Sequence, residues 1–233
     1  MKSPKESFKS LKDTFTLSNG VQIPCVGFGT YLTPDGETAV SSVIEAVHAG
    51  YRHIDTAAVY GNEKSVGKAI RKCGTDRKEL FITSEVWNSA QGYETTLHAF
   101  DKTLSDLELD YLDLYFCHRF DPTTPIEETM EALDSLVRAG KVRALGASAM
   151  YGYQFFNMQL AARDNGWTPF VSMQNHYNLL YREDERELIP ICTQQNVART
   201  PYSPLAAGRL SRLEWDADTK RSRTDKTAVS KYD

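Results

Sequence analysis

Residues 112–148 contain the pattern that decides the fold. They open with a short apolar run, LDLYFC (Leu112–Cys117), and close with a second one, VRALGAS (Val142–Ser148). Between the runs lies a stripe of apolar residues at three- to four-residue spacing: Ile126, Met130, Leu133 and Val137. This spacing is typical of one face of a helix. A strand, an amphipathic helix and a second strand predict a βαβ unit with parallel strands.

The same alternation extends over most of the chain. Apolar runs predict seven strands: Val26–Gly29, Arg52–Asp55, Leu80–Ser84, Leu112–Cys117, Val142–Ser148, Phe170–Gln174 and Val197–Tyr202. Successive strand ends are 26 to 33 residues apart, and two more helical stripes run through residues 40–47 and 93–107. No GxGxxG or GxxxxGK[ST] loop is present, so a doubly wound nucleotide-binding sheet is disfavoured. The sequence therefore predicts an α/β fold of the (β/α)8 TIM-barrel type.

The two ends of the chain depart from this repeat. Thr14–Leu17 and Val21–Ile23 flank Asn19-Gly20 and predict an N-terminal β-hairpin with a type I′ turn. After the seventh strand only 31 residues remain, so the barrel is expected to be truncated after strand 7. We expect a flexible N-terminus over 1–13, a barrel domain over 14–210, and a charged loop or disordered tail over 211–233.

Composition limits the classes of function. A net charge of −4 argues against a nucleic-acid-binding protein, and a mean hydropathy of −0.46 argues against a membrane span. The first residues lack the apolar stretch of a secretion signal. The four cysteines match no zinc or redox spacing, which favours reduced thiols in a cytoplasmic protein without a metal. We expect a monomer or weak oligomer.

Polar residues follow three successive predicted strands, where barrel enzymes carry their active sites. Asp55 closes the second strand with Tyr60 in its loop, Glu85 follows the third, and His118 follows the fourth. Each has a structural alternative: Asp55 as a loop residue or helix cap, Tyr60 as an aromatic plug, His118 as a packed side chain. Their joint placement favours a shared catalytic pocket. No strand end carries a lysine for Schiff-base chemistry, and there is no GxSxG motif.

Several motifs resemble the aldo-keto reductase family. They include GFGTY at 27–31, AGYRHID at 49–55, DTAAVYGNE at 55–63, LFITS at 80–84 and PYSPL at 201–205. The first half is similar to the diketogluconate-reductase branch, and the second half to the branch related to potassium-channel β subunits. The resemblance implies reduction of an aldehyde or ketone by NADPH, with NADH as an alternative. It further implies Tyr60 as proton donor, His118 as the residue that orients the carbonyl, and Asp55 as support for a catalytic lysine.

The resemblance also implies cofactor and substrate contacts. Thr30 and Tyr31 would line the ribose side, and Asp55 would also be a cofactor-binding residue. Ser148 and Gln174 would hold the carboxamide, and Tyr202 would stack on the nicotinamide. Ser203 and Leu205 would meet the pyrophosphate. Tyr31, Trp87 and His118 would shape the substrate pocket. Gln174 and Tyr202 also have structural alternatives, as a polar strand cap and a core aromatic.

Three departures from the family pattern bear on activity. Glu85 occupies the position of the family lysine, so two acids share one site, and a neighbouring carboxylate raises a tyrosine pKa. Ser148-Ala149 replaces the usual Ser-Asn, and the last strand of the family is missing. We therefore expect impaired carbonyl reduction. The alternative is a catalytically silent cofactor-binding or interaction protein, or a truncated gene product.

Overall fold

Seven parallel strands form one curled sheet in the computed structural model, which describes residues 9–213 and 223–232. In sheet order they are β3 (Gly27–Gly29), β4 (His53–Asp55), β5 (Phe81–Val86), β6 (Leu114–Cys117), β7 (Leu145–Ser148), β8 (Ser172–Gln174) and β9 (Ala198–Arg199). Sequence order and sheet order coincide, as in a TIM barrel. The predicted barrel type with seven strands is confirmed.

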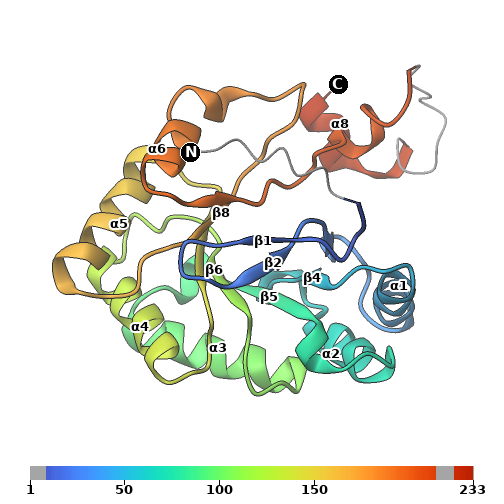
Figure 1. The fold of residues 1–233 in the computed structure, drawn as a ribbon, viewed down its shortest axis with the longest axis horizontal. Coiled ribbons are helices and arrows are strands. Elements are labelled where there is room, and N and C mark those ends of the chain that lie inside the picture. The colour runs from blue at the N-terminus through green and yellow to red at the C-terminus, as the bar shows by residue number, and fades with distance from the viewer. Residues whose placement is uncertain (1–8, 214–222, 233) are drawn as a thin grey trace.

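Helices cover the outside of this sheet, and neighbours along the chain pack against each other (Figure 1). They are α1 (Glu37–His48), α2 (Glu63–Lys72), α3 (Tyr93–Leu107), α4 (Ile126–Arg138), α5 (Gly152–Asn165) and α6 (Leu188–Gln194). The predicted apolar stripes lie within α1, α3 and α4. Their buried faces meet the strands in one apolar core. No helix among the described residues is long and apolar enough to cross a membrane.

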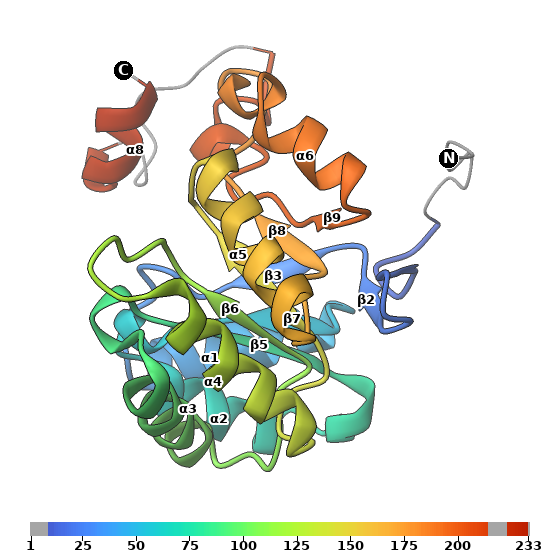
Figure 2. The ribbon, with the colours of Figure 1, turned by 90° about the vertical axis from the view of Figure 1, so that its left-hand side faces the viewer.

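The N-terminal hairpin, β1 (Thr14–Thr16) and β2 (Gln22–Pro24), forms a separate antiparallel pair. Leu17 and Ile23 pack on residues near the beginnings of the barrel strands, so the hairpin closes that end of the barrel (Figure 2). The predicted type I′ turn is wrong. Of the two central turn residues, Asn19 and Gly20, only Gly20 has a positive φ, of 88°. The Gly20 amide donates to the Leu17 carbonyl. This is the three-residue loop in which glycine takes the left-handed position.

All seven barrel strands begin one to three residues later than predicted, and two of them also end at a different residue. β5 continues through Glu85 to Val86, because these residues still pair with Phe116 and Cys117 of β6. β9 ends at Arg199, three residues early, although Tyr202 keeps an isolated bridge to His176. Pro201 lies between them and has no backbone N–H with which to continue the ladder.

The C-terminal segment is not a loop throughout. Residues 226–232 form a helix, α8 (Lys226–Tyr232), so the expected loop or tail is wrong there, while 214–222 and 233 lie outside the described residues. Tyr232 holds the helix in place, since its hydroxyl bonds His176 Nε2 at 2.6 Å and accepts from Asn178 Nδ2 at 2.9 Å. At the other end of the chain, residues 1–8 lie outside the described residues. The Asp13 carboxylate closes a turn at Ser10.

Candidate active site

The four predicted catalytic side chains come together at the carboxyl ends of three adjacent strands. Asp55 ends β4, Glu85 lies in β5, and His118 directly follows β6. Tyr60 ends η1 (Ala58–Tyr60), the short turn after β4. The parallel register places Thr83 beside Asp55 and Phe116 beside Glu85, so these side chains share one end of the barrel. Glu85 was predicted to follow its strand and instead lies within it.

Asp55 is held by two donors. Thr83 Oγ1 donates to Asp55 Oδ2 at 2.6 Å, and Gln174 Nε2 donates to the same oxygen at 3.1 Å. Burial raises the pKa of Asp55 to about 7, and the neighbouring Glu85 raises it further, against the lowering effect of the two hydrogen bonds. Asp55 therefore holds its proton to a much higher pH than an exposed aspartate does.

Glu85 is the least solvated acid of the site. Only 1% of the residue is exposed, and burial raises the pKa of its carboxyl to about 8, with Arg119 acting in the opposite direction. One carboxyl oxygen contacts His118 Nδ1. Apart from this contact, neither Glu85 oxygen has a hydrogen-bonding partner among the described residues. At neutral pH Glu85 is therefore a protonated, neutral carboxylic acid.

His118 is a neutral imidazole at the same pH. Burial lowers its pKa to about 4, Arg119 lowers it further, and Asp55 opposes both. The ring stands at 79° to the Trp87 ring, with the centroids 5.0 Å apart, and 6.1 Å from the Tyr60 ring. His118 thus lies between the residue expected to donate the proton and an aromatic wall of the expected substrate pocket.

Tyr60 is surrounded by groups that disfavour its ionisation. Burial raises the pKa of the phenol well above its usual value, and the carboxyls of Glu85 and Asp55 raise it further. The ring of Tyr31 lies 5.1 Å from that of Tyr60, and 57% of Tyr31 is exposed. Tyr31 therefore lines the rim of the site, on the side facing solvent.

Two residues that position the site were not predicted. Asn62 is fully buried, donates to the carbonyls of Thr30 and Thr33 at 3.0 Å each, and accepts from Thr56 at 3.0 Å. It thereby ties the loop after β3 to the loop that carries Tyr60. Thr83 orients Asp55. An asparagine between Gly61 and the start of a helix is a signal that could have identified Asn62. Thr83 can be found only from the strand register.

The residues expected to hold the nicotinamide lie side by side. Ser148 and Gln174 are directly paired in register at the ends of β7 and β8. The Ser148 hydroxyl makes no hydrogen bond among the described residues, and Gln174 keeps its carbonyl oxygen as an acceptor while its amide donates to Asp55. A carboxamide needs both a donor and an acceptor. These two side chains therefore fit the nicotinamide carboxamide.

The other cofactor residues surround this pair. Tyr202 stacks on His176, with the centroids 5.1 Å apart, and Lys231 of α8 lies 5.1 Å from the Tyr202 ring. Thr30 is fully buried, and its hydroxyl donates to the Asp55 carbonyl at 3.1 Å. Ser203 and Leu205 follow β9, and Leu205 is exposed. A ligand on Tyr202 would therefore lie next to α8.

Ala149 shows the cost of one departure from the family pattern. It follows β7 with φ of 45°, in the left-handed region that asparagine tolerates better than alanine. The alanine removes one side chain able to hold the carboxamide. It also leaves the backbone in a conformation that its own side chain disfavours.

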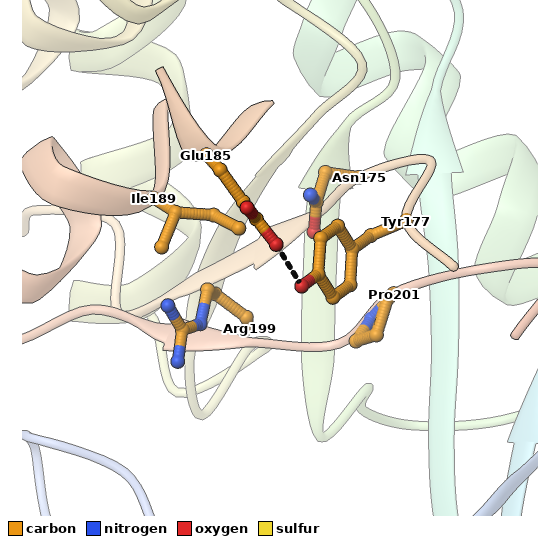
Figure 3. Close-up of a pocket in the computed structure, with 6 residues that line it drawn as sticks. All are labelled: Asn175, Tyr177, Glu185, Ile189, Arg199 and Pro201. Atoms are coloured by element: carbon orange, nitrogen blue, oxygen red, sulfur yellow. Dashed lines mark hydrogen bonds between the residues drawn. The ribbon is translucent and has the colours of Figure 1, made fainter. Parts of the chain in front are cut away.

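A separate cavity of about 420 Å³ lies between α6, the ends of β8 and β9, and η4 (Glu183–Glu185) (Figure 3). Its lining includes Asn175, Tyr177, Glu185 and Arg199, and the Tyr177 hydroxyl donates to Glu185 at 2.5 Å. None of the predicted site residues lines it. This cavity is therefore distinct from the site at the barrel mouth.

Comparisons with known proteins agree with the fold and identify the family. The model of the aldo/keto reductase family matches residues 26–232. Glyoxal reductase of Bacillus subtilis is 43% identical over 201 residues, which cover 86% of this chain and 70% of the relative. An aldo/keto reductase structure from Brucella melitensis matches with a TM-score of 0.75 at 39% identity, covering 83% of this chain and 73% of that one. The structure of the Bombyx mori aldo-keto reductase in complex with NADP matches with a TM-score of 0.72 at 29% identity. The match covers 84% of this chain and 67% of that one.

Proposed function

Because the chain belongs to the aldo/keto reductase family, we propose that it reduces aldehydes or ketones to alcohols with NAD(P)H at the mouth of the barrel. The observation that carries the proposal is the convergence of Asp55, Tyr60 and His118 beside the Ser148–Gln174 pair. A relative named glyoxal reductase supports small aldehydes of the glyoxal type as the first substrates to test. Binding of NADPH in preference to NADH is part of the proposal.

The residues divide the work of the reaction between them. A bound nicotinamide supplies the hydride. Ser148 and Gln174 hold its carboxamide, Tyr202 stacks against its ring, and Thr30, Tyr31, Ser203 and Leu205 line the rest of the cofactor path. Tyr31 and Trp87 flank the carbonyl and exclude water from it. His118 orients the carbonyl oxygen, which must receive one proton.

Glu85 weakens Tyr60 as the donor of that proton. A phenol gives up its proton more readily when a cation stabilises the phenolate, and here two acids lie beside it instead. Each unit by which the Tyr60 pKa rises costs about 1.4 kcal/mol, or tenfold, in this ionisation. We therefore propose that turnover is slower than in a site with lysine at this position.

We expect Glu85→Lys to raise kcat/KM for glyoxal reduction by about tenfold or more, because a cation beside Tyr60 favours the phenolate. The measurement is the initial rate of NADPH oxidation. Glu79→Lys is the matched control, since it makes the same residue substitution at an exposed position and should leave the rate unchanged. Equal rates for wild type and Glu85→Lys would contradict the proposed role of Glu85.

A catalytically silent cofactor-binding or interaction protein is the second candidate. The observations that favour it are the carboxyl of Glu85 in place of a cation and the contact of Lys231 with Tyr202. Titration with NADPH, followed by tryptophan fluorescence, separates the two in the same samples. Saturable micromolar binding without turnover in either variant would favour the silent protein. Binding with turnover in Glu85→Lys favours the reductase.

A further inference from the structure

Glu85 and His118 form a pair that the reduction mechanism above does not use. Glu85 Oε2 contacts His118 Nδ1, and among the described residues these atoms have no other hydrogen-bonding partner. Both groups come from the ends of neighbouring strands, so the backbone ladder maintains their approach, with the His118 amide donating to the Val86 carbonyl at 3.1 Å.

We propose that the proton reaching the carbonyl oxygen comes from His118 Nε2 and is replaced from Glu85 through His118 Nδ1, so that Tyr60 is not the donor in this chain. The proposal rests on the proposed function and specifies how its proton is supplied. His118 is the catalytic residue of the step, and Glu85 acts through it.

The step balances as follows. A bound reduced nicotinamide would supply a hydride, with its electron pair, to the carbonyl carbon, so that the nicotinamide would be oxidised and the carbonyl reduced. The N–H bond at His118 Nε2 breaks, and its proton forms the new O–H bond of the alcohol. The O–H bond of Glu85 breaks as a new N–H bond forms at Nδ1. The products would be the alcohol, the oxidised nicotinamide, the Glu85 carboxylate and a neutral His118, and solvent would then return one proton to the pair.

The protonation states of Glu85 and His118 before the reaction favour proton transfer from Glu85 through His118 to the carbonyl oxygen. Glu85 is neutral and His118 is neutral at pH 7, so the carboxyl O–H is available to Nδ1 and the remaining imidazole proton is on Nε2. Tyr60 is the poorer acid because the same burial and the same carboxyls disfavour its phenolate. A proton route through a neutral acid and a neutral imidazole leaves one negative charge, on Glu85, which Arg119 favours.

Other groups facing Glu85 also affect its ionisation. Asp55 disfavours a second charge, and the thiol of Cys117 and the phenol of Tyr115 lie within electrostatic reach of the carboxyl. Both the thiol and the phenol are protonated at neutral pH because burial raises their pKa values. Burial therefore dominates the ionisation of Glu85, and Arg119 opposes it.

Tyr60→Phe, made in two backgrounds, tests the donor. We expect it to change kcat for glyoxal reduction by less than about threefold in the wild type, where His118 donates. In the Glu85→Lys background we expect a loss of about 100-fold or more, the usual contribution of a general acid. A comparable loss in both backgrounds would overturn the proposal, because Tyr60 would then be the donor in each.

Glu85→Gln tests the second half of the route. The glutamine amide can still donate to Nδ1 and hold the ring, but it has no proton to transfer. We expect kcat of the wild type to fall as pH rises through about 8, where Glu85 ionises, and this alkaline decline to be absent in Glu85→Gln. An unchanged pH profile would reduce Glu85 to a structural role and overturn the proposal. Nitrogen NMR of His118 adds a readout without turnover, and the Nε2–H tautomer is expected in both proteins.

The same variants separate this proposal from the proposed function. An inactive wild type beside an active Glu85→Lys would retain the reductase site and reject the Glu85–His118 route. Inactivity of both, in folded proteins, would reject the reductase and the route together.

Discussion

Asp113 shows how one residue organises the end of the barrel opposite the active site. It is 1% exposed, and its Oδ2 accepts from Arg77 Nη1 at 2.8 Å and from the Ile82 amide at 2.9 Å. Its Oδ1 accepts from Arg143 Nη1 at 2.8 Å. One carboxylate therefore joins the segments before β5, β6 and β7. Asp113 and Arg143 therefore have a structural role at this end of the barrel.

We expect Asp113→Ala to lower the free energy of unfolding by about 3–5 kcal/mol, because it leaves the partly buried Arg77 guanidinium without its carboxylate and the buried Ile82 amide without an acceptor. Arg143→Ala should cost no more than about 1 kcal/mol, because the Arg143 side chain is 52% exposed. Urea unfolding followed by circular dichroism gives both values. Similar decreases in the free energy of unfolding of the two variants would show that the Asp113 carboxylate is not the main source of stability in this cluster.

At the scale of elements, α2 and α3 approach most closely at a glycine. A Cβ on Gly67 would lie 2.2 Å from the Leu107 carbonyl oxygen, at the last residue of α3. The Arg71 guanidinium, one helical turn later, donates to the same carbonyl at 3.1 Å. Gly67 therefore sets the distance between these two helices, and the outer layer packs around it.

Gly67→Ala should lower the melting temperature, although alanine is the better helix former by about 1 kcal/mol. Overpacking costs about 1–3 kcal/mol, and here the obstacle is backbone, which cannot rotate away. Glu131→Ala, at an exposed position of α4, is the control and should be near neutral. Stabilisation of Gly67→Ala would mean that the two helices separate without cost.

At the scale of the whole molecule, buried ionisable groups act on stability in opposite directions. Asp55 and Glu85 have raised pKa values, about 7 and about 8, so the folded chain holds protons there that the unfolded chain has released. The buried His53 and His118 have pKa values lowered to about 4, so the folded chain holds fewer protons there. The acids therefore destabilise the fold as pH rises, and the histidines destabilise it as pH falls.

Glu85→Gln isolates the acid contribution. The Glu85 pKa is raised from 4.5 in the unfolded chain to about 8 in the folded chain. The contribution of Glu85 protonation to the stability of the fold is therefore complete below pH 4.5 and is lost as pH rises through about 8. We expect the stability of Glu85→Gln relative to wild type to increase over this window, by at most about 1.4 kcal/mol per pH unit. Chemical unfolding at several pH values measures it, with Glu79→Gln as the surface control. A difference that does not change with pH would contradict the neutral, buried state of Glu85.

Much of the fold was predictable because periodicity records burial. The stripes in α1, α3 and α4 and all seven apolar strand runs follow from which side chains face the core. The end of β5 and the hairpin turn were not predictable, because backbone pairing and the conformation of Asn19 depend on neighbours. α8 was missed because its segment has few apolar residues, and Tyr232 docks it through hydrogen bonds to His176 and Asn178.

The sequence by itself determined the order of the barrel strands, the residues at their carboxyl ends, and the presence of an acid at the position where the family resemblance implies a lysine. Strand order follows from a repeat along the chain, and the residue type at each position is read directly from the sequence, without knowledge of its spatial neighbours. Only the tertiary structure decided that Glu85 is sealed from solvent, lacks a hydrogen-bond donor and touches His118. Solvation and contact between strands are properties of packing, and the protonation of this site depends on both.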